Sequence, residues 1–115
     1  MAYRLVVSDT VEVPIKFTAN DGGKNASFFF HLLAKRLSQD EFKSIIDAAD
    51  GRSVSEFLVE QITGWRGQRL VVDDSGQPAA YSPEAMEAML GLVGLPGIVF
   101  SAYIEACGAK GKEKN

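Results

Sequence analysis

The 115-residue chain contains a single cysteine, Cys107, and a single histidine, His31. A lone cysteine cannot close a disulfide within the chain, so we read Cys107 as a small apolar helix residue in a reducing compartment. A metal centre or a nucleophile with its base needs further side chains at a recognisable spacing, and none accompanies His31. We interpret His31 as a structural histidine on a strand, and we predict no enzyme activity, no catalytic residue, no metal and no cofactor.

The chain also lacks an excess of positive charge. Its 12 Lys and Arg residues are outnumbered by 15 Asp and Glu residues, which gives a formal net charge of -3. No basic run is interleaved with aromatics, so neither nucleic acid nor an anionic membrane is favoured as a partner. The sequence has neither the roughly 18 consecutive apolar residues of a membrane span nor the apolar stretch of a signal peptide. We expect a cytosolic protein that binds neither nucleic acid nor membrane.

The overall amino-acid composition is typical of a folded domain. Hydrophobic residues make up 46% of the chain and charged residues 23%, far from the composition of disordered proteins. A chain of this length buries roughly two-thirds of the surface that it exposes when unfolded. No repeat or linker divides the sequence. We predict a single α+β domain over residues 1–107 and a flexible C-terminal tail over residues 108–115, where Gly and Lys recur without hydrophobic periodicity.

The N-terminal part has the pattern of strands. Apolar residues alternate with others along one stretch and predict a half-buried strand: Val11, Val13, Ile15 and Phe17. Pro14 within it has no amide to donate, which favours an edge strand or a bulge. Residues 4–7 are a candidate preceding strand. The turn residues 20–23 lead to a second predicted strand over residues 27–37, in which Phe28–Phe30 indicate apolar contacts on both faces.

Helix-start signals follow. Ser38–Glu41 is a capping box that opens a first helix, with Gly51 suited to end it and an apolar face of Phe42, Ile45, Ile46 and Ala49. Ser53–Glu56 repeats the box and predicts a second helix with the stripe Val54, Phe57, Leu58, Ile62 and Trp65. The predicted fold is therefore an N-terminal antiparallel β-hairpin or small sheet followed by about four α-helices.

The last two predicted helices begin at prolines. Ser82 with Pro83 caps a third helix, whose stripe is Met86, Met89, Leu90 and Val93. Pro96 opens a last helix through Cys107, with the face Val99, Ala102, Tyr103 and Ala106. Gly91, Gly94 and Gly97 lack the preceding strand and following Lys of a phosphate loop, so we read them as helix-end and packing glycines. Met86, Met89 and Phe100 fit either a pliable partner-binding groove or ordinary core, and core is the commoner outcome at helical spacing.

Residues 68–81 predict a loop or small hairpin around the turn Asp73–Gly76. Asp73 and Asp74 resemble part of a calcium loop, but its alternating acidic ligands and distal glutamate are missing. We therefore interpret these aspartates as turn residues.

Several segments, in this order and spacing, resemble the tail assembly chaperones of long-tailed bacteriophages. They are residues 57–65 (FLVEQITGW), 72–78 (VDDSGQP), 81–90 (YSPEAMEAML) and Ala102–Tyr103. Residues 13–17 (VPIKF) and 34–38 (AKRLS) are similar to the opening strand and first helix junction of that family. The resemblance covers most of residues 11–107, although Ser75 interrupts the Asp-Gly pair that the family often shows.

The resemblance implies a non-enzymatic protein of the host bacterial cytoplasm, encoded by a phage or prophage. Such a protein binds the tape measure protein, helps recruit tail tube subunits and leaves before the virion matures. Members of the family are frequently made in two forms by a ribosomal frameshift, for which the tail at residues 108–115 is a suitable junction. Self-association is left open.

The family motifs also suggest residues for a partner interface: Trp65, Gly76, Pro78, Tyr81, Ser82 and Tyr103. Trp65 and Tyr81 fit either interface anchors or structural positions at a helix end and a helix start. The alternative function is another phage structural role, such as a tail-completion or head-tail joining protein. A small enzyme or ligand-binding domain is the least favoured class, because no convergent polar site can be drawn from the sequence.

Overall fold

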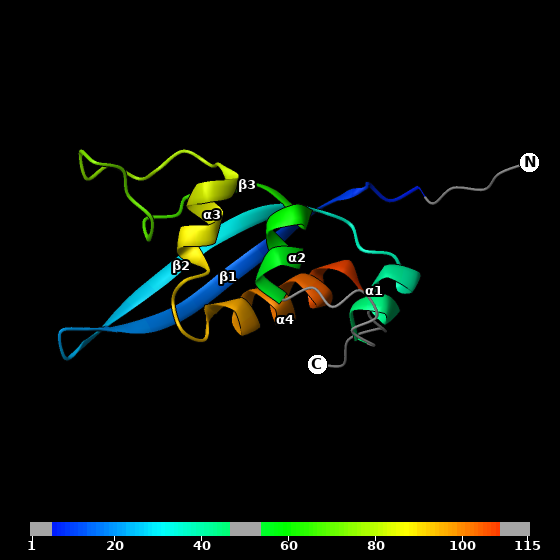
Figure 1. The fold of residues 1–115 in the computed structure, drawn as a ribbon, viewed down its shortest axis with the longest axis horizontal. Coiled ribbons are helices and arrows are strands. Elements are labelled where there is room, and N and C mark those ends of the chain that lie inside the picture. Colours follow the sequence, from blue (N-terminus) through cyan, green and yellow to red (C-terminus); the bar gives the residue numbers. More distant parts are fainter. Residues whose placement is uncertain (1–5, 47–53, 109–115) are drawn as a thin grey trace, which may run out of the picture.

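The computed structural model describes residues 6–46 and 54–108. The three strands form one antiparallel sheet in the order β1-β2-β3. The elements in chain order, labelled in Figure 1, are β1 (Thr10–Asp21), β2 (Lys24–Lys35), α1 (Gln39–Ile46), α2 (Val54–Gln61), β3 (Ile62–Arg66), α3 (Pro83–Met89) and α4 (Leu95–Cys107).

The predicted order of elements, with all strands before all helices, is wrong. β3 follows α2 and pairs with β2, so two helices separate the hairpin from the third strand. The second helix was predicted to run on to Trp65, whereas it ends at Gln61. The β-branched and aromatic residues of Ile62–Arg66 fit a pleated strand, and the edge of β2 supplies their hydrogen-bond partners. The described residues thus form a mixed α+β fold, a three-stranded antiparallel sheet with four helices.

A two-residue turn, Gly22–Gly23, joins the 12-residue strands β1 and β2. Both glycines have positive φ, 64° and 98°, as a primed hairpin turn requires. The Oδ1 atom of Asn20 accepts a hydrogen bond from the amide of Gly23 at 2.8 Å. The predicted hairpin is present, but β2 starts earlier than expected and ends at Lys35, before Leu37.

Hydrogen-bonded and non-hydrogen-bonded pairs alternate along this antiparallel hairpin. The amide of Arg36 donates to the carbonyl of Asp9 at 2.5 Å, which sets the phase of the alternation. Pro14, opposite His31, falls five pairs from Asp9 and hence at a non-hydrogen-bonded position. Its missing amide faces the free edge of β1 and removes no ladder bond. The prediction that this strand lies at a sheet edge is confirmed.

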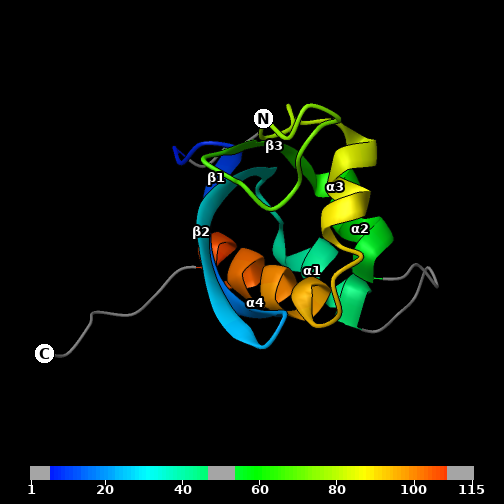
Figure 2. The ribbon, with the colours of Figure 1, turned by 90° about the vertical axis from the view of Figure 1, so that its left-hand side faces the viewer.

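One face of the sheet carries the hydrophobic core. α4 lies across this face in contact with β1, and α2 contacts both α3 and α4. Figure 2 shows the sheet curving around α4, with α2 and α3 on the side away from β1 and β2. The alternation predicted for β1 is confirmed, because its apolar face is buried. The core includes Val11, Val13, Ile15, Phe17, Phe30, Leu32, Ala34, Phe57, Leu58, Met86, Met89, Leu95, Val99 and Tyr103.

No helix of the described segments covers the opposite, outer face of the sheet (Figure 2). Phe29 points to this face and is 59% exposed, so the prediction of apolar contacts on both sides of Phe28–Phe30 is wrong for it. Its ring makes an edge contact with His31 at 5.0 Å between centroids. Arg66 forms an ion pair with Glu12, from β3 to β1 across β2. This outer face is therefore a mixed polar and aromatic surface.

The helix-start signals are confirmed where the structure describes them. Ser38 and Glu41 form the predicted reciprocal box: the Ser38 amide donates to Glu41 Oε1 at 2.9 Å, and the Glu41 amide donates to Ser38 Oγ at 3.1 Å. The Ser82 Oγ atom caps α3 by accepting from the Ala85 amide at 3.0 Å. α4 starts at Leu95, with Pro96 in its first turn.

Other sequence predictions concern residues outside the described ranges. These are the end of the first helix at Ala49 and Gly51, the cap Ser53, the first half of the candidate strand at 4–7, and the tail beyond Gly108. Within the described ranges, no helix is long and apolar enough to cross a membrane.

Candidate protein-binding surface

Two of the residues singled out by the family motifs, Trp65 and Tyr81, form a structural cluster between β3 and α3. Trp65 and Tyr81 meet edge to face with ring centroids 5.2 Å apart. The Trp65 indole N–H donates to the carbonyl of Ala79 at 3.1 Å, and the Tyr81 hydroxyl donates to the carbonyl of Ile62 at 2.7 Å. Partial burial raises the pKa of Tyr81. Both aromatic rings and both polar groups thus hold the segment before α3 against β3.

Gln68 completes this cluster, and no motif in the sequence singled it out. Gln68 is 3% exposed. Its side-chain amide connects the two sides of the loop, at Val71 and Ala79. Its Nε2 atom donates to the carbonyls of Val71 at 2.9 Å and Ala79 at 3.2 Å, while its Oε1 atom accepts from the Val71 amide at 2.8 Å. These three hydrogen bonds hold the two sides of the loop together, although the loop contains no regular strand.

Hydrogen bonds among neighbouring residues determine the conformation of the acidic turn at Asp73–Gly76. Gly76 has φ of 84°, and Val72 and Pro78 form an isolated bridge, so residues 68–81 are a loop with one β-bridge. Asp73 Oδ1 accepts from the Ser75 hydroxyl at 2.7 Å and amide at 2.9 Å, and from the Gln77 amide at 3.0 Å. These hydrogen bonds, led by the Ser75 hydroxyl, lower the pKa of Asp73 below its ordinary value of 3.8.

Tyr103 lies apart from that cluster, on α4. Its side chain is fully buried, and its hydroxyl donates to the carbonyl of Lys35 at 2.5 Å, at the end of β2. Burial raises the pKa of Tyr103. Met86 and Met89 are also in the core, with 0% and 1% exposure, so the groove reading of these two methionines is wrong. None of the three side chains is at the surface to meet a partner.

An apolar groove does occur elsewhere, where the turn end of the hairpin projects past the first turn of α4 (Figure 1). We call it the hairpin groove. It has a volume of about 320 Å³ and is lined by Phe17, Thr18, Ala19, Asn20, Leu92, Val93, Leu95 and Ile98. Three of its apolar side chains reach the solvent: Val93 is 97% exposed, Ile98 40% and Leu92 37%. Val93 was predicted to continue the buried stripe of α3, but that helix ends at Met89.

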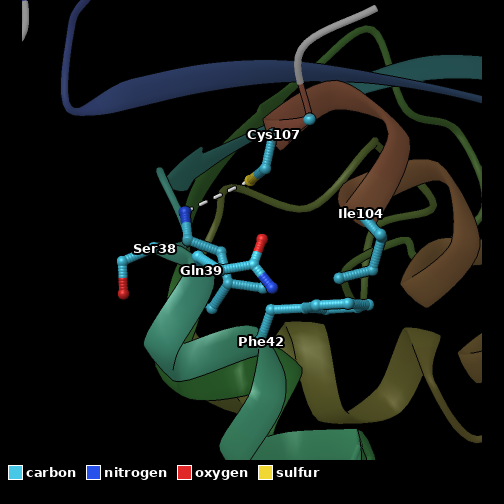
Figure 3. Close-up of a pocket in the computed structure, with 7 residues that line it drawn as sticks. Ser38, Gln39, Phe42, Ile104 and Cys107 are labelled. Carbon is cyan, nitrogen blue, oxygen red and sulfur yellow. Dashed lines mark hydrogen bonds between the residues drawn. The ribbon is translucent and has the colours of Figure 1, made fainter.

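A second, smaller hollow of about 240 Å³ lies between α1 and α4. Figure 3 shows Phe42 and Ile104 side by side on one side of it and Cys107 on the other. The amide of Leu37 donates to the Cys107 sulfur at 3.2 Å, which ties the end of α4 to the start of α1. The cysteine thus has a packing contact of its own in this hollow.

No group of three His, Cys, Asp or Glu side chains is arranged to hold a metal ion within residues 6–46 and 54–108. His31 is half-buried on β2 beside Phe29, on the outer face of the sheet. No protein-family model, curated protein or solved structure matches this chain. Six of the eight residues that line the hairpin groove are apolar.

Replacing Tyr81 with Phe tests whether this residue is structural. The change removes the hydroxyl that bonds the Ile62 carbonyl and keeps the ring contact with Trp65. We expect the free energy of unfolding in urea to fall by about 1 kcal/mol, the usual net value of such a bond. Unchanged stability together with weakened binding of a partner would instead make Tyr81 an interface anchor.

The Ser75→Ala variant tests the origin of the Asp73 pKa. Without the hydroxyl, the pKa of Asp73 should rise towards 3.8, as followed by carboxyl NMR shifts during acid titration. Because the folded-state pKa is lowered, the contribution of ionised Asp73 to stability is present above its unfolded pKa and is lost as the pH falls through the folded one. Ser82→Ala, which removes a hydroxyl elsewhere, should leave the titration unchanged. A wild-type Asp73 that titrates at or above 3.8 contradicts the assignment.

Proposed function

We propose that the chain is a tail assembly chaperone of a long-tailed bacteriophage, which binds the tape measure protein and assists assembly of the tail tube. The ordered motifs between residues 11 and 107 support the family, and the hairpin groove is the observation that carries the binding role. The proposal implies action in the host bacterial cytoplasm and release before the virion matures.

The hairpin groove has the character of a protein-binding surface. Large side chains that stay exposed in a folded chain favour a partner when they are contiguous, as Leu92, Val93 and Ile98 are along one groove. Fully burying one such aliphatic side chain contributes about 1.5–3 kcal/mol. Val93, which is 97% exposed, has nearly its whole side chain available for such burial.

The wall of the groove is held in place by the hairpin's own packing. The ring of Phe17 stacks on Phe28 at 5.2 Å and meets Phe30 edge-on at 6.2 Å. On the opposite side, Gly94 takes a φ of 90°, which turns the chain into α4 directly after Val93. A concave apolar surface with fixed walls suits one face of an amphipathic helix in a client chain, because the surface need not be ordered on binding.

Two exposed valines give a matched test of this role. Val93 in the groove and Val6 outside it are both 97% exposed, so a charge at either position should leave folding intact. With Val93→Asp, the yield of soluble complex with the tape measure protein on coexpression should drop roughly tenfold, which corresponds to about 1.4 kcal/mol. Val6→Asp should leave that yield unchanged.

Equal yields from the two variants would show that the hairpin groove does not bind the tape measure protein. No soluble complex for the unaltered chain, across several segments of the tape measure protein, would reject the proposed function itself. Mass spectrometry of purified virions separates the remaining alternative, because a tail-completion or head-tail joining protein stays in the particle and a chaperone does not.

A further inference from the structure

The tip of the hairpin places an aspartate directly before a glycine. Asp21 is the last residue of β1, and Gly22 is the first residue of the two-residue turn. Both residues are exposed, and the tip projects past the first turn of α4 (Figure 1). Asp-Gly pairs are prone to cyclise, because glycine has no side chain to hinder the attack of its amide nitrogen on the preceding carboxyl group. A second such pair, Asp50–Gly51, lies outside the described residues.

The backbone around Gly22 is open to this reaction. In the phase of the hairpin ladder, Asp21 and Lys24 form the hydrogen-bonded pair next to the turn. The Gly23 amide donates to Asn20 Oδ1 at 2.8 Å. The Gly22 amide, between these two bonded positions, donates to no atom of the described residues. Apart from its chain neighbours, no heavy atom lies within 4 Å of the place where a Cβ would stand on Gly22.

The other aspartates of the described ranges are held by hydrogen bonds. For three of them, Asp9, Asp40 and Asp74, the amide of the next residue already donates to a side-chain oxygen. These bonds run from Thr10 to Ser8 at 3.0 Å, from Glu41 to Ser38 at 3.1 Å and from Ser75 to Asp73 at 2.9 Å. The fourth, Asp73, accepts three hydrogen bonds on its Oδ1 atom, which fix its carboxylate. Asp21 is therefore the described aspartate best placed to react with its own backbone.

We propose that Asp21 is a modification site, at which the chain isomerises spontaneously to isoaspartate. The Gly22 nitrogen attacks Cγ of Asp21, so a C–N bond forms and a C–O bond of the carboxyl group breaks. The lost oxygen leaves as water together with the amide proton, and the product is a succinimide ring. Water then opens the ring at either carbonyl. Opening at Cγ restores aspartate, whereas opening at the main-chain carbonyl breaks its bond to the Gly22 nitrogen and leaves isoaspartate. One water is released and one is consumed, so no other reagent is needed.

Isomerisation changes the length of the backbone at the turn. In isoaspartate the main chain runs through Cβ and Cγ of Asp21, which lengthens the connection between the two strands. A two-residue turn requires a fixed connection length, so the pairs nearest the turn should open. Ala19, in the hydrogen-bonded pair with Ala26, also lines the hairpin groove. The ring of Phe17, stacked on the opposite strand, should hold the register beyond that point. The reaction needs only this chain and water, so the inference is independent of the proposed function.

Mass spectrometry of the aged protein tests the proposal. The purified chain is incubated folded for several weeks in neutral buffer and digested with trypsin, beside an unaged sample that corrects for isomerisation during digestion. Trypsin separates the two Asp-Gly pairs, because Asp21 falls in peptide 17–24 and Asp50 in peptide 44–52. Peptide 17–24 should split into two forms of equal mass and different retention, and fragmentation should place isoaspartate at Asp21. Asp74, in peptide 70–110, should contain several-fold less isoaspartate.

Two substitutions at the same position serve as controls. Asp21→Glu keeps the charge but must close a larger ring, so peptide 17–24 should lose the second form. Asp21→Asn reaches the same succinimide by loss of ammonia, which leaves more readily than water, so isoaspartate should accumulate several-fold faster. Circular dichroism confirms that both variants are folded.

The isomerised protein shows whether the turn opens. Amide hydrogen exchange at Ala19 and Ala26 should be faster in the isoaspartate form than in the unaged chain, because these residues form a hydrogen-bonded pair near the turn. Isoaspartate at Asp21 that does not exceed the level at Asp74 overturns the proposed site. Unchanged exchange at Ala19 and Ala26 overturns its effect on the hairpin. Neither result bears on the yield of the client complex, which is measured separately.

Discussion

The register of the β1–β2 hairpin is the constraint on which the rest of the structure depends. The Gly22–Gly23 turn fixes which residues lie opposite each other, and side chains alternate strictly between the two faces of a strand. A slip by one residue would turn Val13 and Ile15 to solvent and bring Glu12 into the core. Because α4 packs directly on β1, the whole helical layer would lose its support.

The same register determines the surfaces that remain for partners. The long strands extend past the start of α4, so Phe17 and the residues after it become one wall of the hairpin groove, with Val93 opposite. β3 is shorter than β2, so it leaves part of that strand unpaired. The hairpin groove is the surface that we propose for the client. The groove and the unpaired part of β2 both arise because the hairpin is longer than the elements that cover it.

Local signals in the sequence predicted what local chemistry determines. Ser38 and Ser82 cap helices because their hydroxyls reach amides three residues ahead, and the alternation of β1 follows from its own residues. The strand at Ile62–Trp65 could not be predicted in this way. Its apolar residues also fit the stripe of the preceding helix, and the edge of β2 decides between the two. Val93 was likewise predicted to belong to a helical stripe because its spacing fits one, although α3 ends before it.

The candidate site was predicted less well than the fold. The motif residues Trp65 and Tyr81 hold a loop against β3, and Tyr103 is buried, so the features that carry the family resemblance are mainly structural. The hairpin groove joins residues 17–20 with residues 92–98, and no spacing along the chain reveals that contact.

Amide hydrogen exchange of the chain with and without the tape measure protein tests the central claim most directly. The account predicts slower exchange in the complex at residues 17–20 and 92–98, with the loop at 68–81 unchanged. Protection confined to that loop, or to the hollow between α1 and α4, would contradict it.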